Sequence, residues 1–226
     1  KPVDIGTEFE LEGYPNRDST GYKEAYKIPE IQNLIRGTLR YKGFSEVFDA
    51  AHRLGLLSTE APVNSELTWH DWLEKSLAEK KVTLNEHIKH AFNWLGLDSN
   101  ESLPEEPSML DAFCNLLKQK LQYKADEFDM IALQHKFELA FGDQREYLTS
   151  TLVVKGDPQS YSAMSKTVGY PVAIATQLIL DGDIDDKGVH IPVERHFYEP
   201  ILEGLEQEGI ICVEKSEPTM NEHFFA

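Results

Sequence analysis

The sequence reads Leu-Ile-Arg-Gly-Thr-Leu-Arg-Tyr-Lys-Gly-Phe over residues 34–44. Apolar side chains alternate there with polar and cationic ones, a period of two that predicts a strand with one apolar and one cationic face. Residues 31–45 contain no Asp or Glu, although the chain holds 39 acidic residues. The cationic face carries Arg36, Thr38, Arg40 and Lys42. Because successive side chains of a strand point to opposite faces, Leu39 falls on the opposite, apolar face.

Two interpretations of this cationic face are open. Guanidinium groups bind carboxylates through two parallel hydrogen bonds, so the face could be a carboxylate site. It could equally be a solvated surface whose charges do little. Arg17 favours the first, because it lies in a turn-forming loop that can present a side chain to a ligand. The alternative for Arg17 is an ion pair with Asp18 or Glu12.

The neighbouring segments predict an α+β fold. A strand is expected over Thr7–Leu11, followed by a loop over 13–20. A helix is expected over 46–57, ending at Gly55. Residues 131–141 and 144–155 flank Gly142-Asp143, the signal for a type II′ hairpin. Between these parts, residues 66–125 show helical spacing of apolar side chains and predict an inserted helical subdomain.

The C-terminal part predicts two further helices. The first opens at Asp157-Pro158, breaks or kinks near 169–171 and continues to Leu180. The second covers 197–207, and a short strand over 210–213 precedes a frayed tail over 216–226. The first helix has a hydroxyl-rich start that could hold an anion or could cap itself. Its candidate residues are Ser160, Ser162, Ser165 and Lys166.

Composition excludes several classes of function. The chain has 226 residues and a net charge of −17, which disfavours nucleic acid and anionic membranes as partners. Cys114 and Cys212 form no disulfide framework, and no metal-ligand spacing is present. The sequence has no segment long enough to span a membrane, no signal peptide, no nucleophile elbow and no Gly-x-Gly-x-x-Gly motif. Cofactor-binding, metal-binding and catalytic residues are therefore not assigned.

Four segments resemble the saccharopine dehydrogenase family. They are Glu-Gly-Tyr-Pro-Asn-Arg-Asp-Ser-Thr (12–20), Leu-Ile-Arg-Gly-Thr-Leu-Arg-Tyr-Lys-Gly-Phe (34–44), Phe-Asp-Met-Ile-Ala-Leu-Gln-His-Lys-Phe (128–137) and a last one over 149–182 that includes Tyr-Ser-Ala-Met-Ser-Lys-Thr-Val-Gly-Tyr-Pro. The resemblance spans nearly the whole chain and is weakest over 60–108. It identifies the C-terminal, substrate-binding portion of such an enzyme.

The resemblance implies a mixed-sheet α+β domain for saccharopine binding and dimerisation over 1–50 and 126–160. It further implies a helical insert over 51–125 and a C-terminal segment over 161–226 that packs on a Rossmann domain absent from this chain. NADP would bind mainly to that domain, so the chain alone is expected to be inactive. The implied substrate-binding residues are Arg17, Thr38, Leu39 and Arg40, with Leu39 acting through its backbone.

The implied reaction is hydride transfer at the imine formed from glutamate and aminoadipate semialdehyde, giving saccharopine. Expected partners are saccharopine, glutamate, the Rossmann domain and a second copy in a homodimer. The hairpin stretch 135–151 favours a stand-alone, cytoplasmic enzyme of lysine biosynthesis. A mitochondrial, bifunctional, lysine-degrading parent is the alternative. A different class also stays open: an interaction module that kept the fold and lost catalysis.

Overall fold

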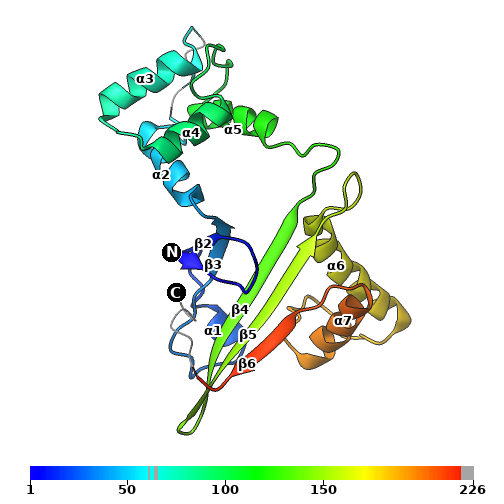
Figure 1. Ribbon diagram of the computed structural model, residues 1–226. Helices are drawn as coiled ribbons and strands as arrows, with labels where there is room; N and C mark the ends of the chain where they lie inside the picture. The colour runs from blue at the N-terminus through cyan, green and yellow to red at the C-terminus, as the bar shows by residue number, and fades with distance from the viewer. Residues whose placement is uncertain (61, 64–65, 220–226) are drawn as a thin grey trace. The chain divides into compact units, whose positions relative to one another are not determined.

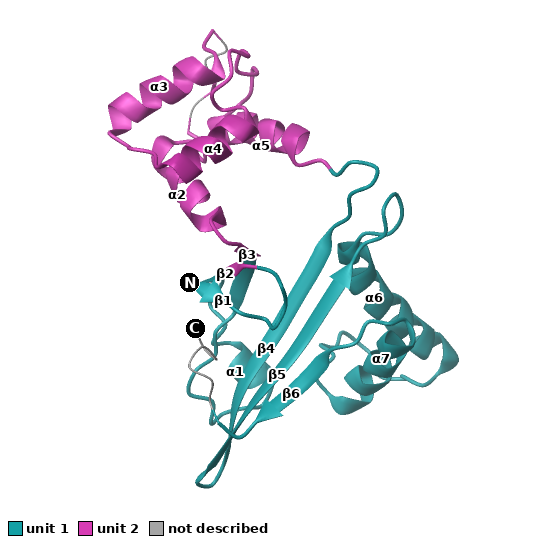
Figure 2. Ribbon diagram, viewed as in Figure 1, with its two compact units in different colours: residues 1–9, 13–39, 123–226 teal, residues 10–12, 40–122 magenta. Residues whose placement is uncertain are grey.

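The computed structural model describes residues 1–60, 62–63 and 66–219. The chain divides into two compact units, which Figure 2 shows in separate colours. The strand-containing unit comprises residues 1–9, 13–39 and 123–226, and the helical unit comprises residues 10–12 and 40–122. The α+β class with an inserted helical part is thereby confirmed. The domain limits expected at residues 51 and 161 stay predictions.

Thirteen helices and strands are present in the described residues (Figure 1). In chain order they are β1 (Pro2–Val3), β2 (Leu11–Pro15), α1 (Tyr22–Ala25), β3 (Gly37–Tyr41), α2 (Phe44–Leu54), α3 (Trp69–Lys80), α4 (Glu86–Leu95), α5 (Met109–Lys120), β4 (Met130–Phe141), β5 (Gln144–Lys155), α6 (Ala163–Asp181), α7 (Arg195–Gln207) and β6 (Val213–Glu217).

The first sheet has the strand order β1-β2-β3. Gly13 of β2 donates its N–H to the Lys1 carbonyl at 2.7 Å, and the Lys1 ammonium donates to the Gly13 carbonyl at 2.9 Å. The strand expected over Thr7–Leu11 is wrong, because β2 begins at Leu11 and continues to Pro15. Its Gly and Pro suggested a loop, but backbone pairing to strands on both sides makes the segment extended.

The second sheet is built on a long hairpin, with the order β4-β5-β6. The predicted hairpin is confirmed: Phe141 pairs with Gln144 across the turn, where Gly142 has φ 65°. The strand expected over 210–213 is wrong, because β6 begins at Val213 and pairs antiparallel with β5. Ile210 lies instead in an apolar cluster with Leu152 of β5 and Leu205 of α7.

Helices α6 and α7 pack together, and α6 contacts β4 and β5 (Figure 1). Of the break or kink predicted near 169–171, the break is wrong, since α6 runs without interruption through Pro171, and the kink stays a prediction. The frayed tail expected from 216 is wrong for its first residues, because β6 extends to Glu217. Residues 220–226 of that tail lie outside the described residues.

The start of α6 is set by Asp129, which stands just before β4. Its carboxylate accepts hydrogen bonds from the N–H groups of Ala163 at 2.6 Å and Met164 at 2.9 Å. The Ser162 hydroxyl accepts a third bond from the helix, from the Ser165 N–H at 2.9 Å. A Cβ at Gly156 would lie 2.2 Å from the Asp129 carboxylate, so glycine is needed there. These bonds fix the helix start at 163, five residues after the predicted Pro158.

The helical unit has its own core, and its predicted helices are confirmed as α3, α4 and α5. Its largest fully buried side chains are Leu54, Leu56, Phe92, Leu97 and Phe113. None of the described helices is long and apolar enough to cross a membrane. This unit also contains all three Trp residues of the chain, so tryptophan fluorescence reports on it alone.

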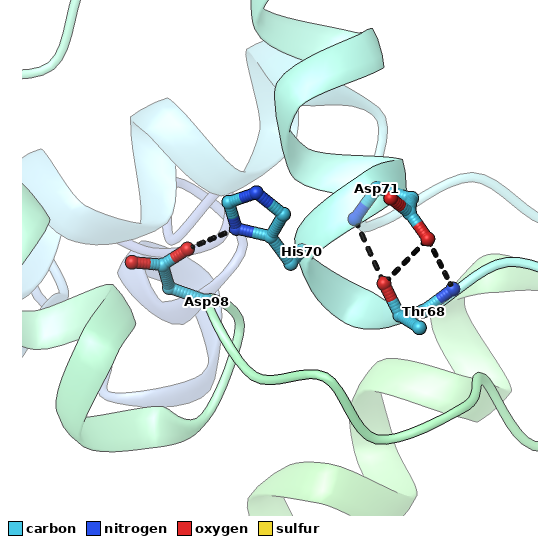
Figure 3. A network of polar contacts seen from close by, with 4 residues as sticks. All are labelled: Thr68, His70, Asp71 and Asp98. Carbon is cyan, nitrogen blue, oxygen red and sulfur yellow. Dashed lines mark hydrogen bonds and ion pairs between the residues drawn. The ribbon is translucent and has the colours of Figure 1, made fainter.

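Polar contacts fix the N-terminus of α3 (Figure 3). Thr68 and Asp71 form a capping box, in which each side chain accepts a hydrogen bond from the other residue's N–H group. His70 Nδ1 lies 2.6 Å from the Asp98 carboxylate, which comes from the segment after α4. The hydrogen bond to Asp98, more than any other cause, raises the pKa of His70 above its ordinary value.

Removing the Asp129 carboxylate should loosen the first turns of α6. We expect Asp129→Ala to lower the local opening free energy there by about 1–2 kcal/mol, because two helix N–H groups lose their acceptor. Native-state hydrogen exchange of the Lys166 and Thr167 amides measures this directly. Asp126→Ala is the matched control, since the exposed Asp126 makes no hydrogen bond or ion pair with the described residues. Equal exchange rates in the two variants would contradict the capping role.

The stability of the helical unit should depend on the ionisation of His70. Because the folded-state pKa is raised, the His70–Asp98 contact contributes fully below the unfolded pKa of about 6.5 and is lost as pH rises through the folded value. The urea midpoint of tryptophan fluorescence should therefore fall from pH 6 to pH 9 more steeply in the wild type than in His70→Gln. His90→Gln, at an exposed site on α4, should keep the wild-type slope.

Candidate functional site

The loop after β2 presents Arg17 and is held by its neighbours. The Asp18 carboxylate accepts hydrogen bonds from the Thr20 N–H at 2.9 Å and the Thr20 hydroxyl at 2.8 Å. These two bonds, the backbone one first, hold the pKa of Asp18 below its ordinary value. An Asp side chain bonded to the backbone two residues on makes a tight turn. Arg17 therefore lies beside a tight turn whose hydrogen bonds constrain the backbone.

Ser19 joins this loop to the residue that precedes β3. Its hydroxyl accepts a hydrogen bond from the Arg36 N–H at 3.2 Å and donates one to the Arg17 carbonyl at 3.4 Å. Ser19 is only 6% exposed, in a segment whose other loop residues are exposed. The Asn16 N–H adds a bond to the Arg36 carbonyl at 2.9 Å. The backbone at Arg17 is thus fixed relative to Arg36.

The Arg17 side chain is exposed and makes no hydrogen bond or ion pair with any described residue. The alternative of an ion pair with Asp18 or Glu12 is not observed. The Asp18 carboxylate is bonded to Thr20, and Glu12 accepts from the Ser45 N–H at 2.6 Å, which lowers the pKa of Glu12. The two acidic residues nearest Arg17 in the sequence therefore already have hydrogen-bond partners.

Strand β3 carries the other three predicted residues in succession. Thr38 and Leu39 are half-buried and Arg40 is exposed. A Cβ placed on Gly13 of β2 would lie 3.6 Å from the Leu39 side chain, so Leu39 covers the neighbouring strand. The ligand contact through the Leu39 backbone stays a prediction.

The predicted apolar face of this strand is only partly correct. Leu39 is covered, but Tyr41 is 59% exposed and Ile35, which lies outside β3, is 80% exposed. The sheet is too small to cover its ends, since β1 has two residues. The alternation of apolar residues therefore predicted the strand correctly and its burial incorrectly.

The other cations of the predicted face have protein partners. Arg36 Nη1 donates to the Tyr22 hydroxyl at 3.3 Å, and Lys42 forms an ion pair with Glu10 at 3.2 Å. Arg40 places its guanidinium carbon 5.4 Å from the centre of the Phe44 ring. Arg36 and Lys42, which were not predicted to bind a ligand, are thus both engaged by groups of the protein.

The start of α6, the other anion site considered from the sequence, is closed to added anions. Asp129 occupies the free N–H groups of the helix, and Lys166 is paired with Asp157 at 2.6 Å. A cavity of about 290 Å³ beside it is lined by three carboxylates and one lysine. Such a lining repels an anionic ligand. The described residues also contain no group of three or more side chains that could hold a metal ion.

Ser19 is the residue that sequence reasoning missed. We expect Ser19→Ala to leave the Arg36 N–H without its partner, at a cost of about 1–3 kcal/mol, and to free the Arg17 loop. Hydrogen exchange at the Arg36 amide should accelerate at least about fivefold. Ser160→Ala, in an exposed turn, is the control and should change nothing at Arg36. Unchanged exchange in Ser19→Ala would show that the hydroxyl does not hold the loop.

Comparison with known proteins places this chain in a family. The family model described as "Saccharopine dehydrogenase C-terminal domain" matches residues 1–210. The solved apo saccharopine dehydrogenase (L-Glu forming) from Saccharomyces cerevisiae is similar, with a TM-score of 0.88 and 37% identity over 96% of this chain and 54% of that one.

Two curated relatives agree. Saccharopine dehydrogenase [NADP(+), L-glutamate-forming] of Saccharomyces cerevisiae is 37% identical over 96% of this chain and 53% of its own length. The mitochondrial alpha-aminoadipic semialdehyde synthase of Rattus norvegicus is 39% identical over 93% of this chain and 25% of its own length. The chain therefore spans a quarter to about half of these relatives. The chain belongs to the saccharopine dehydrogenase C-terminal domain family.

Proposed function

We propose that this chain binds saccharopine, as the substrate-binding part of an NADP-dependent, L-glutamate-forming saccharopine dehydrogenase. Arg17, Thr38, the Leu39 backbone and Arg40 are the proposed contacts. The observation that carries the proposal is Arg17, an exposed guanidinium that has no acidic partner among the described residues and stands on a loop held by Ser19. A cation held in this way loses little freedom when it binds an anion.

The chemistry of saccharopine suits these residues. Saccharopine carries three carboxylates and a secondary amine, and two guanidinium groups with one hydroxyl provide donors in the geometry that carboxylates accept. Glutamate, one of the two components of saccharopine, carries two of these groups and would engage part of the same set.

Local charge supports an anionic ligand in spite of the overall acidity. The chain has a net charge of −17, which alone repels a tricarboxylate. The absence of Asp and Glu over 31–45 leaves β3 in a locally cationic stretch. The acidic residues nearest Arg17 in the sequence are Asp18 and Glu12, and both carboxylates are already bonded to backbone N–H groups.

The described residues do not fit the cofactor. A dinucleotide needs a parallel strand that turns through glycines into a helix N-terminus, whereas the long hairpin sheet is antiparallel and the start of α6 holds Asp129. We propose that NADP binds to sequence outside this chain. The role of the chain's own residues is to hold the carboxylates and so fix where the reacting carbon lies. No general acid is assigned here.

The exposed surface of α6 supports a partner for this chain. Its apolar, exposed residues are Met164, Val168, Val172, Ile179 and Leu180. We propose that this surface, named the α6 apolar surface, packs against the Rossmann-like domain of the full-length enzyme. A homodimer, a role in lysine biosynthesis and a cytoplasmic location belong to the same proposal. A mitochondrial location is the alternative, since the rat relative is named as mitochondrial.

The α6 apolar surface also favours a second candidate, an interaction module without catalysis. Such a module would use α6 to bind a protein and would be indifferent to saccharopine. The uncommitted guanidinium of Arg17 counts against it, because an interaction through α6 needs no such group. Ligand binding distinguishes the two candidates.

Calorimetric titration with saccharopine tests the proposal. We expect Arg17→Ala and Arg40→Ala each to weaken binding about 10- to 150-fold, because each removes a charge-assisted contact of about 1.5–3 kcal/mol. Arg195→Ala is the matched control, since Arg195 is paired with Glu199 on α7.

Binding that is unchanged in the first two variants would contradict the proposed site. A folded wild-type chain that binds no saccharopine, both alone and joined to the cofactor-binding domain, would favour the interaction module.

A further inference from the structure

Arg36 is a second exposed arginine of the strand-containing unit whose charge is not balanced by a carboxylate of the described residues. Its guanidinium contacts the Tyr22 hydroxyl, which accepts a hydrogen bond from Nη1 at 3.3 Å. A phenol hydroxyl is neutral, and this bond uses one of the five N–H donors of the guanidinium. Arg36 therefore keeps its positive charge and most of its donors for a ligand.

Tyr22 is fixed by its own neighbours. Its N–H group donates a hydrogen bond to the Ser19 carbonyl at 3.1 Å, at the start of α1. Its ring stacks on the ring of Tyr26, with the ring centres 5.4 Å apart and the planes inclined by 17°. Because stacking restricts the rotamers of the ring, the Tyr22 hydroxyl holds Nη1 of Arg36 at a defined place and can still donate its own O–H to an acceptor.

One hydroxyl connects the backbones of Arg17 and Arg36. Ser19 Oγ accepts a hydrogen bond from the Arg36 N–H at 3.2 Å and donates one to the Arg17 carbonyl at 3.4 Å. The Ser19 carbonyl also accepts the Tyr22 N–H, so the backbones of all three residues are connected through Ser19. These four residues belong to the same compact unit. Arg17 and the pair formed by Arg36 and Tyr22 are thus preorganised relative to each other.

We infer that Arg36 and Tyr22 bind one carboxylate of saccharopine while Arg17 binds another, which makes Arg36 a specificity-determining residue. This inference deepens the proposed function and rests on it. Arg36 supplies charge-assisted hydrogen bonds, and the Tyr22 hydroxyl adds a neutral hydrogen bond to the same carboxylate. Because a guanidinium that is held before binding loses little freedom, the pair binds a carboxylate more tightly than a mobile arginine does.

The number of carboxylates on the ligand supports this assignment. Saccharopine carries three of them, whereas the contacts proposed above offer two guanidinium groups and the neutral hydroxyl of Thr38. Arg36 lies two residues before Thr38, and alternate residues of an extended chain share a side. The Asn16 N–H donates to the Arg36 carbonyl at 2.9 Å, which keeps the backbone paired beside the neighbouring strands β2 and β3. Arg36 therefore provides a cation close to Thr38 for the third carboxylate.

Calorimetric titration with saccharopine tests the inference. Arg36→Ala should weaken binding about 10- to 150-fold, because it removes a charge-assisted contact and keeps the backbone hydrogen bonds to Asn16 and Ser19. Tyr22→Phe keeps the ring and loses the hydroxyl, so binding should weaken about two- to tenfold. In the Arg36→Ala background, Tyr22→Phe should have a smaller effect than it has alone, because the two groups hold the same carboxylate.

Lys23→Ala is the control for the loss of one positive charge. Lys23 is exposed, follows Tyr22 in α1 and makes no side-chain hydrogen bond or ion pair with the described residues. Its replacement changes the net charge as Arg36→Ala does, so the affinity should fall by less than about twofold. Amide hydrogen exchange at residue 36 is the control for the loop, and Arg36→Ala should keep the protection that Ser19→Ala loses.

The outcomes separate the inference from the proposed function. If Arg17→Ala weakens binding but Arg36→Ala has no larger effect than Lys23→Ala, the inference is overturned and the proposed function stands. A loss of exchange protection at residue 36 in Arg36→Ala that equals the loss in Ser19→Ala would assign the weaker binding to the loop and also overturn the inference. A wild-type chain that binds no saccharopine, both alone and joined to the cofactor-binding domain, contradicts both.

Discussion

The hydrogen bond from the Arg36 N–H to the Ser19 hydroxyl is the constraint on which the proposed site depends. An arginine on a free loop would bind a carboxylate only after losing much of its mobility. The Ser19 contacts and the bond from Asn16 tie that loop to the residue before β3, so Arg17 stands at a defined place relative to the strand that carries Thr38. A buried hydroxyl thus converts a surface cation into a preorganised one.

The electrostatics of this loop depend on acidic residues that already accept hydrogen bonds, rather than on an excess of basic residues. The chain is strongly acidic, and its negative surface would repel an anionic ligand that approaches a single cation. Close to Arg17 in the sequence, however, the carboxylates of Asp18 and Glu12 accept backbone hydrogen bonds, which lower the pKa of both. The same principle closes the start of α6, where Asp129 takes the N–H groups that an external anion would need.

The sequence predicted those elements whose signals are local. Glycine at position 142 and the flanking alternation sufficed for the hairpin, and apolar spacing sufficed for α3, α4 and α5. The sequence-based prediction failed where contacts between residues distant in the sequence determine the structure. Strand β2 is extended because it pairs with β1 and β3. Helix α6 starts at Ala163 because the carboxylate of Asp129, 34 residues earlier in the chain, accepts its N–H. Arg17 and β3 could be singled out from spacing and charge. Ser19 could not, since an Asn-Arg-Asp-Ser loop does not show which hydroxyl becomes buried.

The central claim is that the Arg17 loop and β3 receive the carboxylates of saccharopine. An NMR titration of the isotope-labelled chain with saccharopine tests it most directly, by following the backbone amides of Arg17, Thr38 and Leu39 and the arginine Nε signals. The account predicts saturable shifts at these residues and none for an equal concentration of lysine ethyl ester, which has no free carboxylate. Shifts confined to the acidic cavity beside α6, with Arg17 and β3 unchanged, would contradict it.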